Sequence, residues 1–126
     1  MSKDQTKEIA NKLVAYCKED NSNACLGEFY SEGAISVEAD VMPGKESAET
    51  KGIDGIRAKH EWWETNFELH SSTTEGPFLH GDNHFGVIFE FDATNKQTGD
   101  RESMKELALY TVENGKIIKE EFFYNT

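Results

Sequence analysis

The chain has 126 residues, of which 37% are hydrophobic and 11% aromatic, and its formal net charge is −11. This length fits one domain spanning residues 1–126, which can bury a core large enough to fold without disulfides or metals. An acidic surface repels a phosphate backbone, so we expect no nucleic-acid partner.

The N-terminal dozen residues are polar, and no apolar stretch approaches the length of a membrane span. We therefore expect a soluble, cytoplasmic protein that makes no membrane contact. Cys17 and Cys25 stand outside any CxxC or Cys/His cluster, which indicates two reduced thiols and no zinc site. The chain also lacks a P-loop, a dinucleotide fingerprint and a full calcium loop, so no cofactor or metal is expected.

Two helices are predicted at the N-terminus. The first has an apolar face with helical spacing, made by Ile9, Leu13, Tyr16 and Cys17. A polar turn at 21–23 ends it. Leu26, Phe29 and Tyr30 then repeat at i, i+3 and i+4, which predicts a short second helix that Gly33 stops.

A strand and a third helix follow. Residues 34–40 alternate between apolar and polar side chains, which predicts a first strand, and residues 42–50 are expected to form a surface loop. Gly52 opens the third helix. Its most regular stripe, which should face the sheet, consists of Ile53, Ile56, His60, Trp63 and Phe67.

From His70 onward the apolar period becomes two, which predicts consecutive strands. We expect four, at about residues 69–80, 84–94, 101–113 and 116–125. Asn114-Gly115 is the strongest hairpin signal, a type I′ turn between β-rich flanks. Three helices in the N-terminal half and then hairpins predict an α+β fold, with the helices packed in a curved, mostly antiparallel sheet.

Three stretches carry a family resemblance: residues 29–34 (FYSEGA), residues 52–57 (GIDGIR) and the closing hairpin at 110–124. They resemble the SnoaL-like group of the nuclear-transport-factor-2-like superfamily. The resemblance implies a cone-shaped α+β barrel, a pocket at its open end and a homodimer formed through the sheet. The superfamily includes ketosteroid isomerase, polyketide cyclases, epoxide hydrolases and dehydratases, and also domains that only bind, so the activity stays open.

Carboxylates on predicted strands are the first candidates for chemistry, because a charge that faces a closed interior is costly. They are Glu38, Glu106 and Glu120. Burial in an apolar pocket would raise the pKa of such a group and make it a general base, for proton abstraction next to a carbonyl or for activation of water. Alternatively, these glutamates face solvent or pair with Lys105 and Lys119.

The register of the last hairpin decides which carboxylate lies inside. Counting outward from the turn places Glu106 opposite Phe123 and Tyr110 opposite Lys119. The other face is more apolar and is expected to pack; it holds Leu107, Leu109, Ile118, Glu120, Phe122 and Tyr124. A β-bulge in either strand would change this assignment. The register thus favours Glu120, whereas the chemistry favours Glu106 and Tyr110.

The third helix supplies the opposite wall. His60 should point into the cone, as a hydrogen-bonded wall residue or as an acid or base. Trp63 fits the same stripe, whereas Trp62 points about 100° away. The candidate ligand-binding residues are Tyr16, Trp63, Phe67, Tyr110, Phe122 and Tyr124.

The leading hypothesis is a SnoaL-like domain that binds a mostly apolar small molecule and acts on it as an acid–base isomerase, cyclase or hydratase. Glu106, Glu38, His60 and Glu120 are its candidate catalytic residues, and Tyr110, Tyr124 or a histidine would stabilise an oxyanion. The alternative is a non-catalytic dimeric binding or accessory module.

Overall fold

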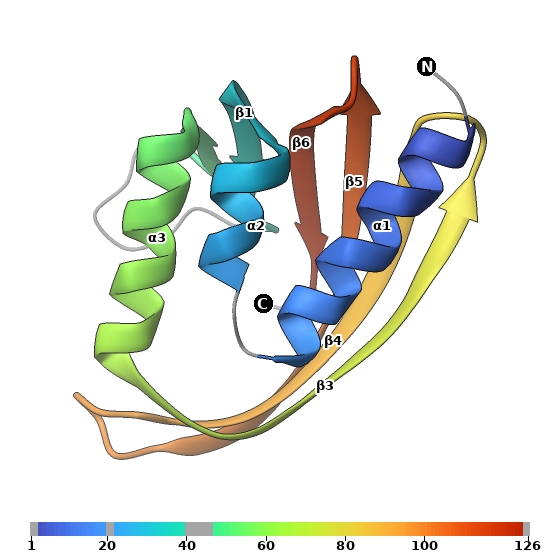
Figure 1. The fold of residues 1–126 in the computed structure, drawn as a ribbon. Coiled ribbons are helices and arrows are strands. Elements are labelled where there is room, and N and C mark those ends of the chain that lie inside the picture. Colours follow the sequence, from blue (N-terminus) through green and yellow to red (C-terminus); the bar gives the residue numbers. More distant parts are fainter. Residues whose placement is uncertain (1–2, 20–21, 40–46, 125–126) are drawn as a thin grey trace.

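The computed structural model describes residues 3–19, 22–39 and 47–124. Its elements, in chain order, are α1 (Lys3–Lys18), α2 (Ser22–Phe29), β1 (Tyr30–Val37), β2 (Glu49–Lys51), α3 (Ile53–Asn66), β3 (Phe67–His80), β4 (His84–Asn95), β5 (Arg101–Glu113) and β6 (Lys116–Phe123) (Figure 1). The predicted α+β class, with three helices ahead of a long meander, is confirmed.

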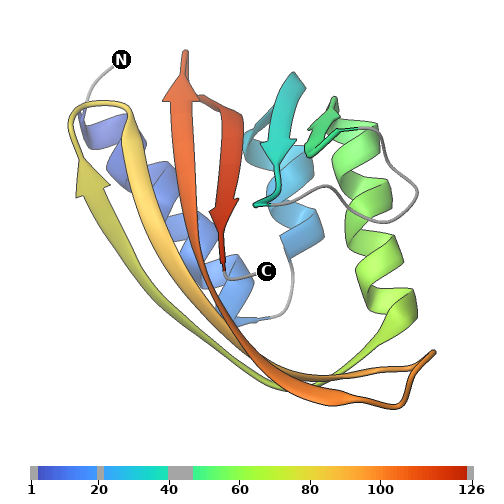
Figure 2. The ribbon, with the colours of Figure 1, turned by 180° about the vertical axis from the view of Figure 1, so that it is seen from behind.

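The strands form one sheet in the order β2-β1-β6-β5-β4-β3. All neighbours are antiparallel except β1 and β6, which run parallel. The sheet curls without closing, and the three helices lie inside its curve (Figures 1 and 2). Within the described residues, no helix combines the length and the apolar character that spanning a membrane requires.

The predicted boundary between the second helix and the first strand is wrong. α2 ends at Phe29, and Tyr30 already begins β1, where it pairs with Ile117 of β6. Tertiary pairing overrides the local helical spacing here, and the side chain of Tyr30 is buried. The predicted loop at 42–50 overlaps β2 at Glu49 and Thr50, while its residues 42–46 lie outside the described residues.

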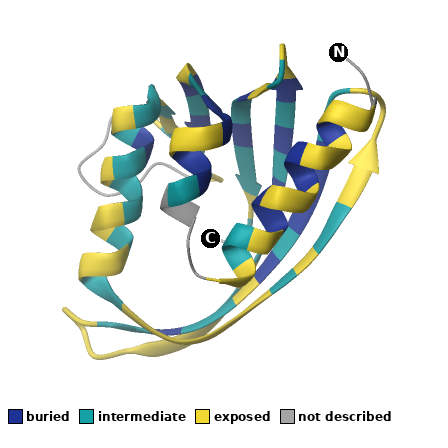
Figure 3. Ribbon diagram, viewed as in Figure 1, coloured by how far each residue is buried: buried dark blue, intermediate teal, exposed yellow. Residues whose placement is uncertain are grey.

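The main core lies between α1, α2 and the inner face of the sheet. α1 contributes a buried stripe that includes Ile9 and Leu13, and β4 contributes Phe85 and Val87, both fully buried (Figure 3). α3 adds a single fully buried side chain, Ile56. The C-terminal half of α3 has no buried residue and borders a cavity.

A β-bulge in β6 corrects the predicted hairpin register. Val112 pairs with Ile117 and Thr111 with Lys119, so Ile118 is the extra residue. Beyond the bulge, Tyr110 lies opposite Glu120, and both are buried. Ile118 therefore interrupts the regular alternation of side chains between the two faces, which the count from the hairpin turn assumed. As a result the inner face holds the alternate residues of β5 from Glu106 to Val112 together with Glu120 and Phe122 of β6.

The same bulge means that the expected packing of Leu107 and Leu109 was wrong. Leu107 is 43% exposed and lies on the outer face of the sheet, opposite Phe123, which is 50% exposed. The strand registers place further apolar side chains on that outer face. We call these residues the outer patch; they are Phe78, Ile88, Leu107, Leu109 and Phe123.

Candidate functional site

A cavity of about 1070 Å³ lies between α3 and the inner face of the sheet. Its lining comes from all three helices, from β3 to β6 and from residues of and just after β1. One wall is aromatic and the other carries carboxyl groups. A cavity of this size exceeds the usual range for small-molecule pockets, so a multi-ring compound has room inside.

The aromatic wall is built where α3 runs into β3. Trp63 stacks on Phe67, with ring centroids 4.9 Å apart, and lies 5.7 Å from Phe91 of β4. Phe89 stacks on Phe91 at 6.0 Å. Trp62 also lines the cavity, although its side chain is 45% exposed, and it meets Phe67 edge-on. These rings give the cavity a flat, apolar wall that suits ring-shaped ligands.

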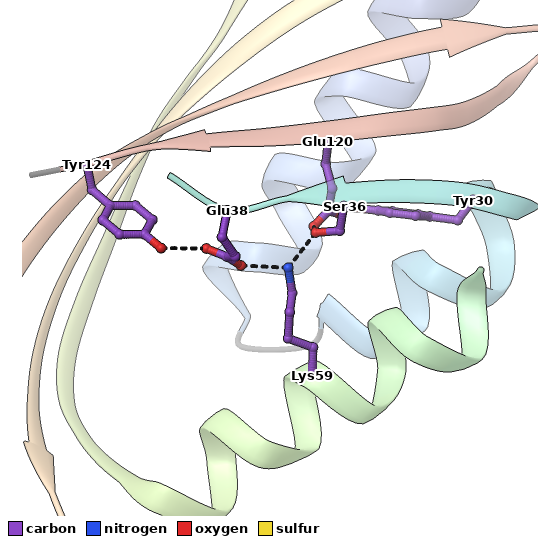
Figure 4. A network of polar contacts seen from close by, with 6 residues as sticks. All are labelled: Tyr30, Ser36, Glu38, Lys59, Glu120 and Tyr124. Atoms are coloured by element: carbon purple, nitrogen blue, oxygen red, sulfur yellow. Dashed lines mark hydrogen bonds and ion pairs between the residues drawn. The ribbon is translucent and has the colours of Figure 1, made fainter. Parts of the chain in front are cut away.

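Glu120 is the most deeply buried carboxyl group at the polar wall, with 1% exposure. It accepts a hydrogen bond from the Tyr30 hydroxyl and another, 2.8 Å long, from Ser36 Oγ (Figure 4). Burial raises the pKa of Glu120, while these two hydrogen bonds and Lys59 act in the opposite direction. The two hydroxyl groups satisfy the carboxyl group, so Glu120 joins β6 to β1.

Lys59 extends this network from α3. Its Nζ donates to Ser36 Oγ at 2.5 Å and to Glu38 Oε1 at 2.6 Å, and it lies 5.2 Å from the ring centroid of Phe122 (Figure 4). Tyr124 donates a 2.8 Å hydrogen bond to the other oxygen of Glu38. Glu38, just after β1, is therefore held by α3 on one side and by the end of the chain's last hairpin on the other.

Glu106 differs from the other two carboxyl groups. It is half-buried on β5 and lines the cavity, and it has no hydrogen bond or ion pair among the described residues. Burial raises the pKa of Glu106 from 4.5 to about 7, helped by the charges of Glu38 and Glu120 and opposed by Lys59. A carboxyl group with this pKa exists in both protonation states near neutral pH, as a general acid or base requires.

His60 faces the same cavity from α3, as predicted. Burial lowers its pKa, and the neighbouring charge of Lys59 lowers it further. It is therefore neutral at pH 7. Tyr110 is buried and stacks on Phe85 at 4.8 Å, so its ring belongs largely to the core while its side chain reaches the cavity wall.

The structure brings together nearly all of the residues that the sequence nominated. The cavity is lined by Glu38, His60, Trp63, Phe67, Glu106, Tyr110, Glu120, Phe122 and Tyr124. Tyr16 does not line it; its hydroxyl donates to Glu28 at the surface between α1 and α2. The count from the turn placed Glu106 and Glu120 on opposite faces of the sheet. Both line the cavity, because the bulge turns them to the same side.

Sequence reasoning missed Lys59, Ser36 and Tyr30. Lys59 carried a usable signal, since it lies three residues after Ile56 and four before Trp63, on the stripe that faces the sheet. A lysine at such a position needs a partner. Among the described residues no three His, Cys, Asp or Glu side chains are grouped as metal ligands would be, and both cysteines are free thiols.

Comparisons with other proteins identify the family. The sequence pattern of the SnoaL-like domain matches residues 4–124. A structure from Mesorhizobium loti, provisionally named a SnoaL-like polyketide cyclase, is 36% identical, with a TM-score of 0.87 over 94% of this chain and 97% of that one. A comparison with curated proteins finds no match.

More distant structures share the fold. A provisionally named isomerase from Bacillus subtilis is 18% identical, with a TM-score of 0.74 over 99% of this chain and 90% of that one. An NTF2-like protein of unknown function from Burkholderia pseudomallei is 15% identical, with a TM-score of 0.75 over 99% and 92%. Since the family pattern covers nearly the whole sequence, the chain belongs to the SnoaL-like domain family.

Proposed function

We propose that this domain binds a mostly apolar, ring-containing small molecule and catalyses proton transfer on it, with Glu106 as the general base. One observation carries the proposal. Glu106 is a half-buried carboxyl group without a hydrogen-bond or ion-pair partner in the described residues, on the wall of a large cavity that stacked aromatic rings also line. Its pKa of about 7 lets it accept and return a proton at neutral pH.

The step is an isomerisation. Glu106 takes a proton from a carbon that lies between a C=O or C=N group and a C=C bond, the C–H electron pair becomes a new C=C bond, and the C=O or C=N pair moves onto the heteroatom. The heteroatom pair then re-forms the C=O or C=N bond, and the original C=C pair takes the proton from Glu106 at its far carbon, which completes a shift of the C=C bond without net oxidation or reduction. Lys59 has three ammonium protons, of which Ser36 and Glu38 accept two, so the third can be donated to a carbonyl oxygen in the cavity.

Glu38 and Glu120 serve a different purpose in this scheme. Each accepts two hydrogen bonds from fixed side chains, which favours a positioning role over proton transfer. They hold Lys59 and Ser36 in place and add negative charge beside Glu106. His60 is neutral at pH 7 and adds a polar group to the wall.

The test is deuterium exchange measured by proton NMR. The probes are 2-tetralone, a ring ketone, and 1,2-dimethyl-3,4-dihydroisoquinolinium, a ring iminium. We expect the protein to exchange the acidic C–H of at least one probe faster than buffer alone, and Glu106→Gln to reduce that excess about a hundredfold. Glu113→Gln, an exposed glutamate on the same strand, should exchange like the wild type. Equal rates in Glu106→Gln and wild type, or no excess over buffer with either probe, contradict the proposal.

The outer patch favours a second candidate, a non-catalytic dimeric binding module. Phe78, Leu107 and Phe123 are each between 43% and 53% exposed on one face of the sheet. Monomeric proteins seldom expose several large apolar side chains on one face. We propose that a second copy of the chain covers this face. If the domain is a dimer that binds ligand but exchanges neither probe faster than buffer, the binding module is the better assignment. The free cysteines support a reducing, cytoplasmic setting for either function.

A further inference from the structure

The cavity has a marked excess of negative groups. Among its described lining residues, five carboxyl groups accompany two lysines. The carboxyl groups belong to Glu38, Glu64, Glu102, Glu106 and Glu120. An anionic ligand would meet repulsion from most sides of such a cavity, whereas a cation would be attracted.

Both lysines are already engaged. Lys59 forms an ion pair with Glu38 at 2.6 Å, and the two side chains are 13% and 15% exposed. Lys105 forms an ion pair with Glu90 at 3.2 Å, and Glu90 does not line the cavity. Both ammonium groups are therefore paired with other carboxyl groups, and Glu106 has no ion pair among the described residues.

The aromatic wall provides a second, independent reason to expect a cation. Trp63, Phe67 and Phe91 present ring faces or edges to the cavity with centroids 4.9 to 5.7 Å apart. Ring faces attract a positive charge through their quadrupole, most strongly when water is excluded. Phe122 already accepts Lys59 in this way at 5.2 Å.

The chemistry of the proposed step points in the same direction. Removing a proton next to a neutral carbonyl would create an enolate anion beside Glu38 and Glu120, where new negative charge is costly. Removing a proton next to a protonated C=N group instead turns a cation and a carboxylate into a neutral enamine and a neutral acid. A partly buried site favours this loss of charge, because ions are poorly solvated there.

We propose that the ligand of this cavity is an organic cation, a ring compound whose positively charged nitrogen adjoins the carbon from which Glu106 takes the proton. The inference rests on the proposed function and names the substrate class of the same site. In the step, the C–H bond breaks, the proton moves to a Glu106 oxygen, the C–H pair forms C=C, and the C=N pair becomes the nitrogen lone pair. Reprotonation at carbon restores the charge on nitrogen, so no oxidant or reductant is required.

The first experiment compares the binding of three probes of equal length. They are 4-phenylbutylamine, 4-phenylbutanol and 4-phenylbutyrate, which are cationic, neutral and anionic at neutral pH. Both tryptophans of the chain line the cavity, so tryptophan fluorescence reports binding directly. At pH 8 we expect the amine to bind about tenfold more tightly than the alcohol, and the carboxylate to bind most weakly.

The second experiment asks whether Glu106 is the source of this preference. Glu106→Gln should bring the amine to within about twofold of the alcohol without weakening the alcohol, whereas Glu113→Gln should leave both unchanged. Lowering the pH to about 5.5 should reduce the wild-type preference in the same manner, because it protonates Glu106. The other groups around Glu106 are Glu38, Glu120, Lys59, Tyr110 and Tyr124, and the Gln variant separates their effects from its own.

Each outcome of these two experiments either supports or overturns the cation proposal. Binding that favours the carboxylate, binding without a charge preference, or a preference that survives Glu106→Gln each overturns the cation proposal. Failure of all three probes to bind at millimolar concentration also overturns it. The proposed function is judged separately, by the loss of deuterium exchange in Glu106→Gln, so a neutral-ligand enzyme and an inactive cation binder give different results.

Discussion

Tyr110 of β5 lies directly opposite Glu120 of β6, and this pairing determines the chemistry of the site. It exists because Ile118 is accommodated as a β-bulge next to the hairpin turn. In an unbulged hairpin Tyr110 would oppose Lys119, and Glu106 and Glu120 would face opposite sides of the sheet. One extra residue therefore brings the carboxyl groups of Glu38, Glu106 and Glu120 to the same cavity.

Glu106→Gln should stabilise the protein, and only at higher pH. The pKa of Glu106 is raised from 4.5 to about 7 in the folded state, so folding favours the protonated form. The wild type loses stability as pH rises from about 4.5 to 7, whereas glutamine has no charge to bury. Relative to wild type, the variant should match it near pH 4.5 and gain up to about 3 kcal/mol above pH 7. Urea unfolding at several pH values measures this difference.

Glu113→Gln is the matched control for that pH series, since it removes an exposed charge from the same strand. Its difference from wild type should stay within about 0.5 kcal/mol at every pH. A Glu106→Gln difference that does not change with pH would show that Glu106 ionises normally in the folded protein.

Glu120→Ala should be among the most destabilising substitutions in the chain. It leaves the hydroxyl groups of Tyr30 and Ser36 without their acceptor in a buried site and opens a cavity. We expect a loss of about 3 kcal/mol in the free energy of unfolding, measured with urea. Glu121→Ala, next in sequence and less buried, should cost less than about 1 kcal/mol. Similar losses for the two alanine variants would mean that the buried network adds little stability.

Lys59→Met should destabilise the fold near neutral pH and raise the pKa of Glu106 further. The change leaves Glu38 as a poorly solvated carboxylate without its cation, for which we expect a loss of about 3 kcal/mol. It also removes the one group that lowers the Glu106 pKa. Unfolding in urea gives the first quantity, and carboxyl carbon NMR gives the second.

A double variant distinguishes loss of the ion pair from loss of packing. Adding Glu38→Gln to Lys59→Met removes the uncompensated charge, so it should recover about half of the lost stability. No recovery would indicate that loss of the contact between Lys59 Nζ and the Phe122 ring, at 5.2 Å, matters more than the uncompensated charge of Glu38.

Leu107→Glu should convert a dimer to a monomer. The substitution places a charge in the middle of the outer patch, beside Ile88 and Phe123. Light scattering after size exclusion should show the wild type at twice the chain mass and the variant at the chain mass. Asn11→Glu, on the exposed side of α1, is the control and should leave the mass unchanged. A wild type that stays monomeric at high concentration contradicts the proposed dimer.

Much of the fold could be predicted because local signals agreed with it. The Asn114-Gly115 turn, the period-two pattern of β4 and the apolar stripe of α3 each specify their element without distant contacts. The bulge carries no such signal: Ile117 and Ile118 are both apolar, so either could face inward. Only packing against β5 decides between them.

The sequence predicted the types of residue in the candidate site better than the contacts between their side chains. Strand carboxylates and a helical aromatic stripe mark a wall on each side. The contact between Tyr30 and Glu120, however, joins residues 90 positions apart, and local spacing assigned Tyr30 to a helix instead. Lys59 could have been found, because a charged residue on a buried helical stripe requires a partner across the interface.

The incomplete closure of the sheet has a consequence for solubility. Among the described residues, β3 forms a 14-residue edge with no strand on its outer side, which in a flat sheet would recruit other chains. Its register shifts twice, between Leu69 and Ser71 and between Glu75 and Phe78, and Pro77 removes one backbone donor. The β3 edge is therefore irregular and rich in Ser and Thr, so it is a poor template for pairing with strands of other chains. The sheet can thus stay unclosed beside its cavity without promoting fibrous assembly.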